Sequence, residues 1–337
     1  MIVRARAPLR LGLAGGGTDV SPYCDIHGGL VLNATIDRYA YAVIRTLADR
    51  DTPRFVATDR GGVAGLGDAG HELQLHRAVY TEIVTNHNDG RPLPVELSTF
   101  CDAPVGSGLG ASSTLVVAMV RAFAELLNLP LDDHEIARIA FKVERVDCGL
   151  QGGRQDQYSA AFGGFNFMEF HDGERAVINS LRIKEWIVCE LEASLLLFYT
   201  GVSRQSAAII SDQSRNISAG DAGAIEAMHG LRREALVMKE CLLRGDFDGI
   251  VDSMRQGWDS KKRTASVVSN PHIEEIYDAA MGAGALAGKI SGAGGGGYMM
   301  FFVPPHRRMD VIRKLGSFEG QVSNCHFTQN GSQGWRA

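Results

Sequence analysis

The pattern of apolar and polar residues predicts a chain that mixes strands with helices. Residues 29–45 are rich in Val, Ile, Tyr and Thr and partly alternate, which is typical of a half-buried strand. Residues 94–101 predict a second strand, and the N-terminal segment predicts a strand that ends in the glycines at 15–17. Residues 112–128 are almost wholly apolar and rich in alanine, so we expect a buried helix there.

Further helices are expected along the rest of the chain. Asp132 and Glu135 have the spacing of a capping box, and the apolar residues behind them share one face, which predicts a helix over 132–146. Residues 222–244 predict a long amphipathic helix, and residues 271–282 predict another with a proline in its first turn. The remaining expected elements are strands: two within 186–199, one at 286–291 and one at 298–303.

The length of the chain, 337 residues, exceeds the roughly 100–200 residues of an average domain. A polar segment at 171–184 follows a glycine-rich turn, and it is the predicted boundary between a domain of residues 1–180 and one of residues 181–337. We find no internal repeat. The sequence therefore predicts a mixed α+β fold with two lobes.

The composition of the chain indicates which binding partners and which cellular compartment to expect. Lys and Arg total 34 against 39 Asp and Glu, a net charge of -5, so we expect no nucleic acid or membrane partner. No apolar run approaches the ~18 residues of a membrane span, and the start of the chain does not resemble a secretory signal. The six cysteines lie far apart without zinc-ligand spacing, which indicates thiols of a reducing compartment. We therefore expect a soluble, cytoplasmic protein.

Glycine is unusually frequent, and its central cluster at 104–114 runs straight into the predicted buried helix. A helix start exposes unpaired N–H groups and the positive end of the helix dipole, and glycines let an anion approach them. Hydroxyl groups behind the glycines can reach a metal ion on a bound phosphate, so we predict a phosphate cradle. Its candidate residues are Pro104, Gly106, Ser107, Gly108, Leu109, Gly110, Ala111, Ser112, Ser113 and Thr114.

This cluster has other possible interpretations. It could be a plain loop with a serine N-cap. A Walker A motif is excluded because its Gly-Lys-Ser/Thr ending is absent. The dinucleotide fingerprint matches at Gly106, Gly108 and Ala111, but a second capped helix follows where a Rossmann unit needs a strand, so we discount it.

Two more glycine clusters flank candidate chemistry. Thr18 and Asp19 follow the N-terminal glycines, where a carboxylate suits sugar hydroxyls; the alternative is an Asp that caps the next helix or turn. Residues 289–298 contain four consecutive glycines, which cost roughly 0.5–1 kcal/mol each relative to alanine. That cost indicates close approach to a ligand or to another loop, with a flexible hairpin as the alternative.

Two carboxylates complete the candidate site. Glu144 borders the buried face of its predicted helix, and it could share a Mg²⁺ ion with a hydroxyl of the central loop. The alternative for Glu144 is a salt bridge to Arg145, Lys142 or Arg138. Asp156 follows a Gly-Gly bend, where it could orient an accepting hydroxyl and take its proton in phosphoryl transfer, or merely cap a helix.

The order of these segments resembles the GHMP kinase superfamily, named for galacto-, homoserine, mevalonate and phosphomevalonate kinases. The family's P-x-x-x-G-L-G-S-S-A-A motif is similar to residues 104–114, its N-terminal motif to 7–19 and its late glycine motif to 289–297. The resemblance covers nearly the whole chain. It implies a ribosomal-protein-S5-domain-2-like N-terminal lobe and a ferredoxin-like C-terminal lobe, with the site between them.

The resemblance also implies roles for single residues. ATP would bind at the central loop with Mg²⁺ held by Ser112 and Glu144, and Asp156 would be the catalytic carboxylate. Arg10 would polarise the attacking oxygen or steady Asp156, and Asp19 would bind sugar hydroxyls.

Two departures from the family pattern matter. Ala111 stands in place of the first loop serine, and Ser113 and Thr114 replace two alanines, so the hydroxyl that meets Mg²⁺ is open. Gly16 and Gly17 replace the Glu-His of galactokinases, which enlarges the pocket and argues against galactose.

Within the superfamily, residues 9–19, 199–204 and 289–297 resemble most the D-glycero-D-manno-heptose 7-phosphate kinases. These phosphorylate the anomeric C1 hydroxyl, giving the 1,7-bisphosphate used for nucleotide-activated heptose. A phosphosugar acceptor needs cations, and Arg204, Lys261, Lys262 and Lys289 are available. The predicted acceptor-binding residues are Gly16, Gly17, Thr18, Asp19, Arg204, Lys289, Gly292 and Gly294.

Three other functions stay open from the sequence. One is a fucokinase-like kinase acting on C1 of an unphosphorylated sugar, and another is a decarboxylase like the one that acts on diphosphomevalonate. The third is a non-catalytic binder of small molecules on the same scaffold, against which the set Ser112, Glu144 and Asp156 argues. The sequence leaves a homodimer open.

Overall fold

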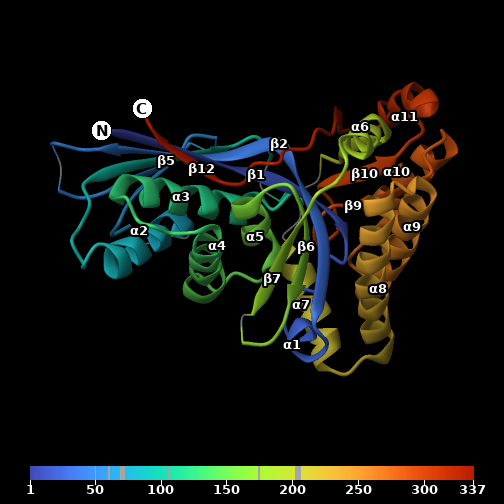
Figure 1. The fold of residues 1–337 in the computed structure, drawn as a ribbon, viewed down its shortest axis with the longest axis horizontal. Helices are drawn as coiled ribbons and strands as arrows, with labels where there is room; N and C mark the ends of the chain where they lie inside the picture. The colour runs from blue at the N-terminus through green and yellow to red at the C-terminus, as the bar shows by residue number, and fades with distance from the viewer. Residues whose placement is uncertain (50, 60, 69–72, 105, 174, 202–205) are drawn as a thin grey trace.

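The computed structural model describes residues 1–49, 51–59, 61–68, 73–104, 106–173, 175–201 and 206–337. It shows two lobes side by side, each built on its own β-sheet (Figure 1). The first lobe has an eight-stranded sheet and the second a four-stranded sheet. The two chain ends lie close together on the first lobe (Figure 1).

Two long antiparallel strands form the centre of the first sheet. β1 (Ile2–Ala14) pairs with β2 (Gly29–Thr46) along most of its length. β2 pairs with β5 (Val95–Cys101) through its second half and with β6 (Phe165–Phe170) through its first half. The order is β12-β1-β2-β5-β3-β4, with β6 beside β2 and β7 beside β6. The remaining strands are β3 (Arg54–Ala57), β4 (Gly62–Gly65), β7 (Ala176–Leu181) and β12 (Gln333–Arg336).

Helices cover one face of this sheet (Figure 1). α3 lies against β1 and β2, and its Val116, Val120 and Phe123 are fully buried. Burying a large apolar side chain contributes roughly 1.5–3 kcal/mol, so α3 is firmly held and its start is a fixed point of the fold. The helices are α2 (Gln74–His87), α3 (Ala111–Leu127), α4 (Asp133–Phe141) and α5 (Gln155–Phe162), with a π-helical turn at Lys142–Asp147.

The second sheet has the order β11-β8-β10-β9, with all neighbours antiparallel. This is the order of a ferredoxin-like β-α-β-β-α-β unit, with several helices in the first crossover. Its strands are β8 (Leu195–Tyr199), β9 (Ala287–Ile290), β10 (Tyr298–Phe302) and β11 (Gln321–Asn324). The helices are α6 (Glu185–Ser194), α7 (Ser206–Ser218), α8 (Ala222–Arg244), α9 (Phe247–Thr264), α10 (Pro271–Gly282) and α11 (Arg308–Leu315), with α1 (Tyr23–His27) after β1.

Most of the predicted elements are confirmed. α8 and α10 begin and end at the predicted residues, and α3 differs from its prediction by one residue at each end. The capping box forms, with Glu135 N donating to Asp132 Oδ1 at 2.8 Å and Asp132 N donating to Glu135 Oε2 at 2.9 Å. β9 and β10 flank the four glycines as an antiparallel pair.

The prediction of two strands within 186–199 is wrong in its first part. Residues Glu185–Ser194 form α6, and the strand β8 begins only at Leu195. The buried residues of α6 are Ile187, Leu191 and Ser194, a spacing that places them on one helix face. A short apolar run with this spacing fits a strand as well as a helix when it is judged from sequence.

The two lobes do not correspond simply to the first and second halves of the chain. The polar segment 171–184 contains β7, which pairs with β6 in the first sheet. Near the C-terminus β12 also pairs with β1, so the chain returns to the first lobe. The division into residues 1–180 and 181–337 stays a prediction.

The six cysteines are all free thiols. Within the described ranges, none of the helices combines the length and the hydropathy that crossing a bilayer requires.

Candidate active site

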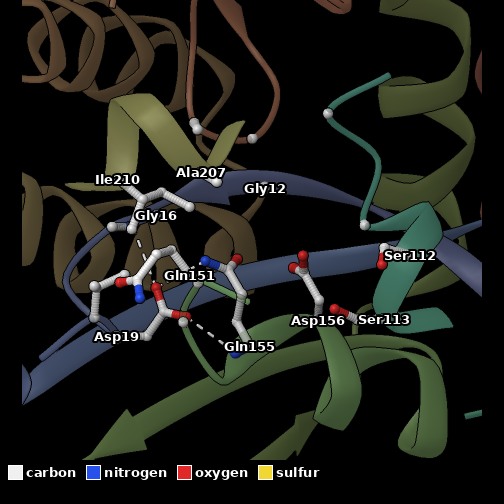
Figure 2. A pocket seen from close by; sticks show the side chains of 18 of the residues that line it. Gly12, Gly16, Asp19, Ser112, Ser113, Gln151, Gln155, Asp156, Ala207 and Ile210 are labelled. Carbon is white, nitrogen blue, oxygen red and sulfur yellow. Dashed lines mark hydrogen bonds between the residues drawn. The ribbon is translucent and has the colours of Figure 1, made fainter. Parts of the chain in front are cut away.

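A cavity of about 240 Å³ lies where the three glycine-rich segments converge. Figure 2 shows Asp156 between two groups of side chains. The group with Gly16, Asp19 and Gln155 is called the Asp19 side below. The opposite wall, residues 106–113 at the start of α3, is called the α3 side. Residues of α7, α9 and the late glycine segment add to the lining from the second lobe.

On the α3 side, bare backbone leads into the helix. Gly108 and Gly110 both have a φ of +78°, a region that favours glycine. Gly110 is the N-cap residue of α3, so no side chain caps the helix. A Cβ atom at Gly110 would lie 3.1 Å from Asp156 Cγ. The open start of α3 thus lines the cavity beside Asp156, which is the arrangement of an anion site.

The late glycine segment packs against this central loop. A Cβ atom at Gly292 would lie 2.8 Å from Gly108 Cα, and one at Gly297 would lie 2.4 Å from Ser107 O. Ser291 Oγ also donates to Gly108 O at 2.9 Å. Loop-to-loop approach, one of the two reasons predicted for these glycines, is therefore present, and Gly292 also lines the cavity.

Glu144 brings together the predicted metal-binding positions. Its Oε1 accepts a hydrogen bond from Ser112 Oγ at 2.8 Å. Its Oε2 accepts from Ser113 Oγ at 2.6 Å and from Gln157 Nε2 at 2.7 Å. Both serines donate to this carboxylate, so the serine N-cap considered for the loop does not form.

Arg145 supplies the positive charge beside Glu144, which is only 1% exposed. Arg145 Nη1 lies 3.4 Å from Glu144 Oε1, so one of the salt bridges left open by the sequence is present. The same guanidinium donates to Ser113 Oγ and Gly153 O, both at 3.3 Å. Arg145 therefore offsets a buried charge and ties Glu144 to the loop that precedes α5.

Ser112 and Glu144 fit a magnesium ion. Both line the cavity, and their oxygens are hard donors of the kind that Mg²⁺ prefers. In the part of the chain that the structure describes, no group of three or more His, Cys, Asp or Glu could hold a metal. One or two protein ligands are sufficient for Mg²⁺ in a phosphate site, because water and phosphate oxygens complete its coordination.

Arg10 of β1 forms an ion pair with Asp156 of α5. Arg10 Nε and Nη2 both lie 2.7 Å from Asp156 Oδ1, and Nη1 donates to Gly108 O at 2.7 Å. Among the described residues, none donates to Asp156 Oδ2, which a Cβ atom at Gly110 would approach to 3.2 Å. Arg10 thus holds one carboxylate oxygen and leaves the other free near the start of α3.

Asp19 is 1% exposed and accepts four hydrogen bonds from the protein. Its Oδ1 accepts from Gly17 N at 3.2 Å and Gln155 Nε2 at 2.9 Å. Its Oδ2 accepts from Arg154 N at 2.9 Å and Gln155 N at 3.0 Å. Four donors occupy the lone-pair positions of a carboxylate. The next helix, α1, has Pro22 as its N-cap residue and no side-chain cap, so Asp19 does not cap it. Asp19 instead accepts main-chain N–H groups at the start of α5, 135 and 136 residues later in the chain. Its contact with a sugar stays a prediction.

Gly16 and Gly17 line the cavity as predicted, and their missing side chains leave space in it. A Cβ atom at Gly16 would lie 3.8 Å from Gln155 Nε2 and 3.9 Å from Lys261 Nζ, which is ordinary van der Waals contact. Any longer side chain at Gly16 would therefore extend between these two polar groups.

Some predicted residues are not part of the cavity wall. Thr18 is fully buried and its hydroxyl lies 2.8 Å from both Gly15 O and Leu30 O. Leu109 packs in the apolar core between the lobes. Arg204 lies outside the described residues. The predicted residues that do not line the cavity are Pro104, Leu109, Thr114, Thr18 and Gly294.

Two lysines from the second lobe line the cavity, Lys261 of α9 and Lys289 of β9. Burial and, to a lesser extent, the Arg10 charge lower the pKa of Lys261 to about 8, against an opposing effect of Asp19 and Asp156. Burial likewise lowers the pKa of Lys289 to about 7, with the charges of Lys261 and Arg10 adding to the effect. Lys262 does not line the cavity.

Sequence reasoning missed several of these residues. Gln155 and Gln157 flank Asp156, but nothing in the sequence shows what they contact. The sequence analysis names Lys261 only as an available cation, although the apolar pattern around it indicates that it is buried. Ile250, Met254 and Trp258 repeat every four residues on the buried face of α9, and Lys261 continues that face.

The GHMP kinases N terminal domain matches residues 75–164, and the GHMP kinases C terminal family matches residues 238–320. The chain is 44% identical to a D-glycero-alpha-D-manno-heptose 7-phosphate kinase from Campylobacter jejuni, over 99% of each chain. A solved D-glycero-D-manno-heptose 1-phosphate kinase from Bacteroides thetaiotaomicron is 42% identical, with a TM-score of 0.83 over 99% of each chain.

A more distant structure shares the fold. Galactokinase from Lactococcus lactis, solved with galactose, matches 98% of this chain and 95% of its own with a TM-score of 0.76 at 15% identity. The chain belongs to the GHMP kinase family, which confirms the predicted two-lobed α+β fold. It is an ATP-dependent kinase of that family.

Proposed function

We propose that this chain transfers the γ-phosphoryl group of ATP to the anomeric C1 hydroxyl of D-glycero-D-manno-heptose 7-phosphate. The product is the 1,7-bisphosphate, a precursor for nucleotide-activated heptose. The observation that carries the proposal is the Arg10–Asp156 pair, whose free carboxylate oxygen lies beside the open start of α3. The full-length likeness to the Campylobacter jejuni enzyme supports a heptose 7-phosphate as the acceptor.

The triphosphate of ATP is assigned to the α3 side of the cavity. The glycines at 106, 108 and 110 let phosphate oxygens approach the N–H groups at the start of α3. Ser112 and Glu144 would hold Mg²⁺, which when bound neutralises charge on the phosphate oxygens. Ser113 and Gln157 keep the Glu144 carboxylate in place for that role.

Asp156 orients the accepting hydroxyl and takes its proton. The C1 oxygen bonds to the γ-phosphorus while the bond from that phosphorus to its bridging oxygen breaks, and ADP leaves. The proton goes to Asp156 Oδ2, because Arg10 occupies Oδ1. The N–H groups and dipole of α3 stabilise the negative charge on the transferred group. Positioning and charge neutralisation supply most of the acceleration.

The acceptor sugar is assigned to the Asp19 side. Gly16 and Gly17 leave room there for a sugar longer than a hexose. Asp19 holds the start of α5 beside this site, and its direct contact with sugar hydroxyls stays a prediction. Lys289 and Gly292 line the wall contributed by the second lobe and complete the proposed acceptor site.

A sugar panel tests this function by measuring ADP release from ATP. We expect turnover with heptose 7-phosphate and none with heptose 1-phosphate, because the anomeric oxygen of the latter already carries a phosphate. L-fucose and galactose should be poor acceptors. Turnover of L-fucose without turnover of heptose 7-phosphate would support a fucokinase-like enzyme instead, and turnover of heptose 1-phosphate would move the reaction away from C1.

A cytoplasmic location and a homodimer stay predictions. A cytoplasmic kinase has access to ATP, and the free cysteines suit a reducing compartment. Fractionation of the producing cells tests the location, and light scattering of the purified protein tests the dimer.

A further inference from the structure

Lys261 and Lys289 are buried in the cavity wall, and no described residue gives either of them a carboxylate partner. They are 5% and 7% exposed. Lys261 Nζ donates to Gly16 O at 3.4 Å, and Lys289 Nζ donates to Leu13 O at 3.0 Å. Within the ranges that the structure describes, neither ammonium forms a salt bridge. An ammonium has three N–H donors, so each lysine keeps donors available for a ligand.

The electrostatic environment of the two lysines favours the binding of an anion. Arg10 adds a third positive charge close to both of them, and its side chain is buried as well. Asp156 is the carboxylate that pairs with Arg10. The charges of Asp19 and Asp156 partly offset that of Lys261, but the part of the chain that the structure describes gives neither lysine an ion pair of its own. Buried cations of one sign that line a cavity are stabilised when a negatively charged ligand enters it.

The position of Lys261 separates this anion from the triphosphate of ATP. Lys261 contacts Gly16, which belongs to the Asp19 side of the cavity. Figure 2 shows Asp156 between Gly16 and Ser112, which marks the α3 side. A negative group beside Lys261 therefore lies across Asp156 from the glycine loop, on the side assigned to the sugar.

We infer that Lys261, with Lys289 beside it, binds the phosphate group that the acceptor sugar already carries. This inference rests on the proposed function and adds the residues that would select a phosphorylated sugar. The next residue, Lys262, provides a matched control. Its side chain is 32% exposed and lies 3.7 Å from Asp259 and 3.6 Å from Glu274, outside the cavity wall.

The test compares Lys261→Met with Lys262→Met. Steady-state rates are measured with heptose 7-phosphate and with the same heptose lacking phosphate. Losing a hydrogen bond to a charged group costs about 1.5–3 kcal/mol, which corresponds to about a 10- to 100-fold change. We expect Lys261→Met to raise KM for heptose 7-phosphate by that factor, with KM for ATP and kcat/KM for the unphosphorylated heptose nearly unchanged. Lys262→Met should behave as the wild type.

Each other result has a definite meaning. An unchanged KM for heptose 7-phosphate, or an equal loss on both sugars, would overturn the inference. A raised KM for ATP alone would assign the anion to the γ-phosphate.

If the wild type fails to use heptose 7-phosphate, the proposed function fails, and calorimetric binding of inorganic phosphate then tests the subsite separately. Phosphate should bind the wild type and Lys262→Met at least ~10-fold more tightly than Lys261→Met, and equal affinities would reject the subsite. Thermal unfolding verifies that each variant is folded.

Discussion

Asp19 accepts two hydrogen bonds from Gln155, one from its main-chain N–H at 3.0 Å and one from its side-chain amide at 2.9 Å. Gln155 is the first residue of α5 and directly precedes Asp156. A Cβ atom at Gly153 would lie 1.9 Å from Asp19 Oδ2, so a glycine is required where the two segments meet. The carboxylate of Asp19 therefore fixes where α5 begins and, through it, where Asp156 stands.

This relationship predicts the effect of Asp19→Asn. An amide nitrogen cannot accept the hydrogen bonds that one carboxylate oxygen now receives, so the start of α5 should shift. Displacing a reacting group by about 1 Å can cost on the order of 10²-fold in rate. We expect kcat to fall about 10- to 100-fold with less than about a 3-fold change in KM for the acceptor. Steady-state kinetics with heptose 7-phosphate measures both constants.

A control distinguishes this role from direct sugar binding. Asp25 pairs with Arg154, whose Nη2 lies 3.2 Å from Asp25 Oδ1, but in the described structure it accepts no backbone amide of α5. Asp25→Asn should leave kcat within about 3-fold of the wild type. If Asp19→Asn raises KM for the acceptor and spares kcat, then the main work of Asp19 is to bind sugar hydroxyls.

Glu144→Gln should weaken the binding of Mg²⁺ to the active site. The variant keeps the shape and one acceptor oxygen but loses the negative charge that a divalent cation needs. We expect the Mg²⁺ concentration for half-maximal activity to rise at least ~10-fold, because changing even the outer-shell partner of a ligand typically costs 10- to 100-fold in metal affinity. The control is Glu82→Gln, whose carboxylate pairs with Lys142 outside the cavity wall. An unchanged Mg²⁺ requirement would reject Glu144 as a ligand.

Gly16→Leu should narrow the Asp19 side without disturbing the backbone. Its Cβ position meets only ordinary contacts with Gln155 and Lys261, so the new side chain extends into the cavity. We expect KM for heptose 7-phosphate to rise by roughly 10-fold or more, since about 1.4 kcal/mol of lost contact suffices. KM for ATP should stay the same. A Gly67→Leu variant, where a Cβ atom meets nothing within 4 Å, is the control. Equal effects on both substrates would place the sugar elsewhere.

Lys289→Met should stabilise the protein near neutral pH. The folded pKa of Lys289, about 7, lies below its ordinary value of 10.5. Between these pH values the unfolded chain binds a proton that the folded chain lacks, so the lysine lowers stability more as the pH falls toward 7. We expect the variant to gain roughly 1–3 kcal/mol at pH 7, and less near pH 10. Urea unfolding at both pH values measures this, and an equal gain at both would contradict it.

Elements with long, regular patterns were predictable from the sequence. α8 and α10 carry their own caps, Asp221 and Asn270, and an apolar face that defines their length. The central glycine cluster was predictable as a helix start because its glycines precede an apolar run. α6 was not, because its apolar positions also fit a short strand.

The polar partners inside the site depend on the tertiary fold. Asp19 meets Gln155 only because the loop after β1 lies beside the start of α5, 136 residues later in the chain. Lys261 enters the cavity from α9, a helix that the sequence analysis did not identify even though Asp246 caps it. No local pattern reports such pairings, since each joins segments that are far apart in the chain.

The central claim is that Asp156 directs phosphoryl transfer to the anomeric oxygen of heptose 7-phosphate. The most direct measurement is ³¹P–¹H correlation NMR of the product formed from heptose 7-phosphate and ATP by the wild type and by Asp156→Asn. We predict a new phosphorus coupled to the anomeric proton, formed on the order of 10²- to 10⁴-fold more slowly by the variant. A new phosphorus on any other carbon, or equal rates for the two proteins, would contradict the account.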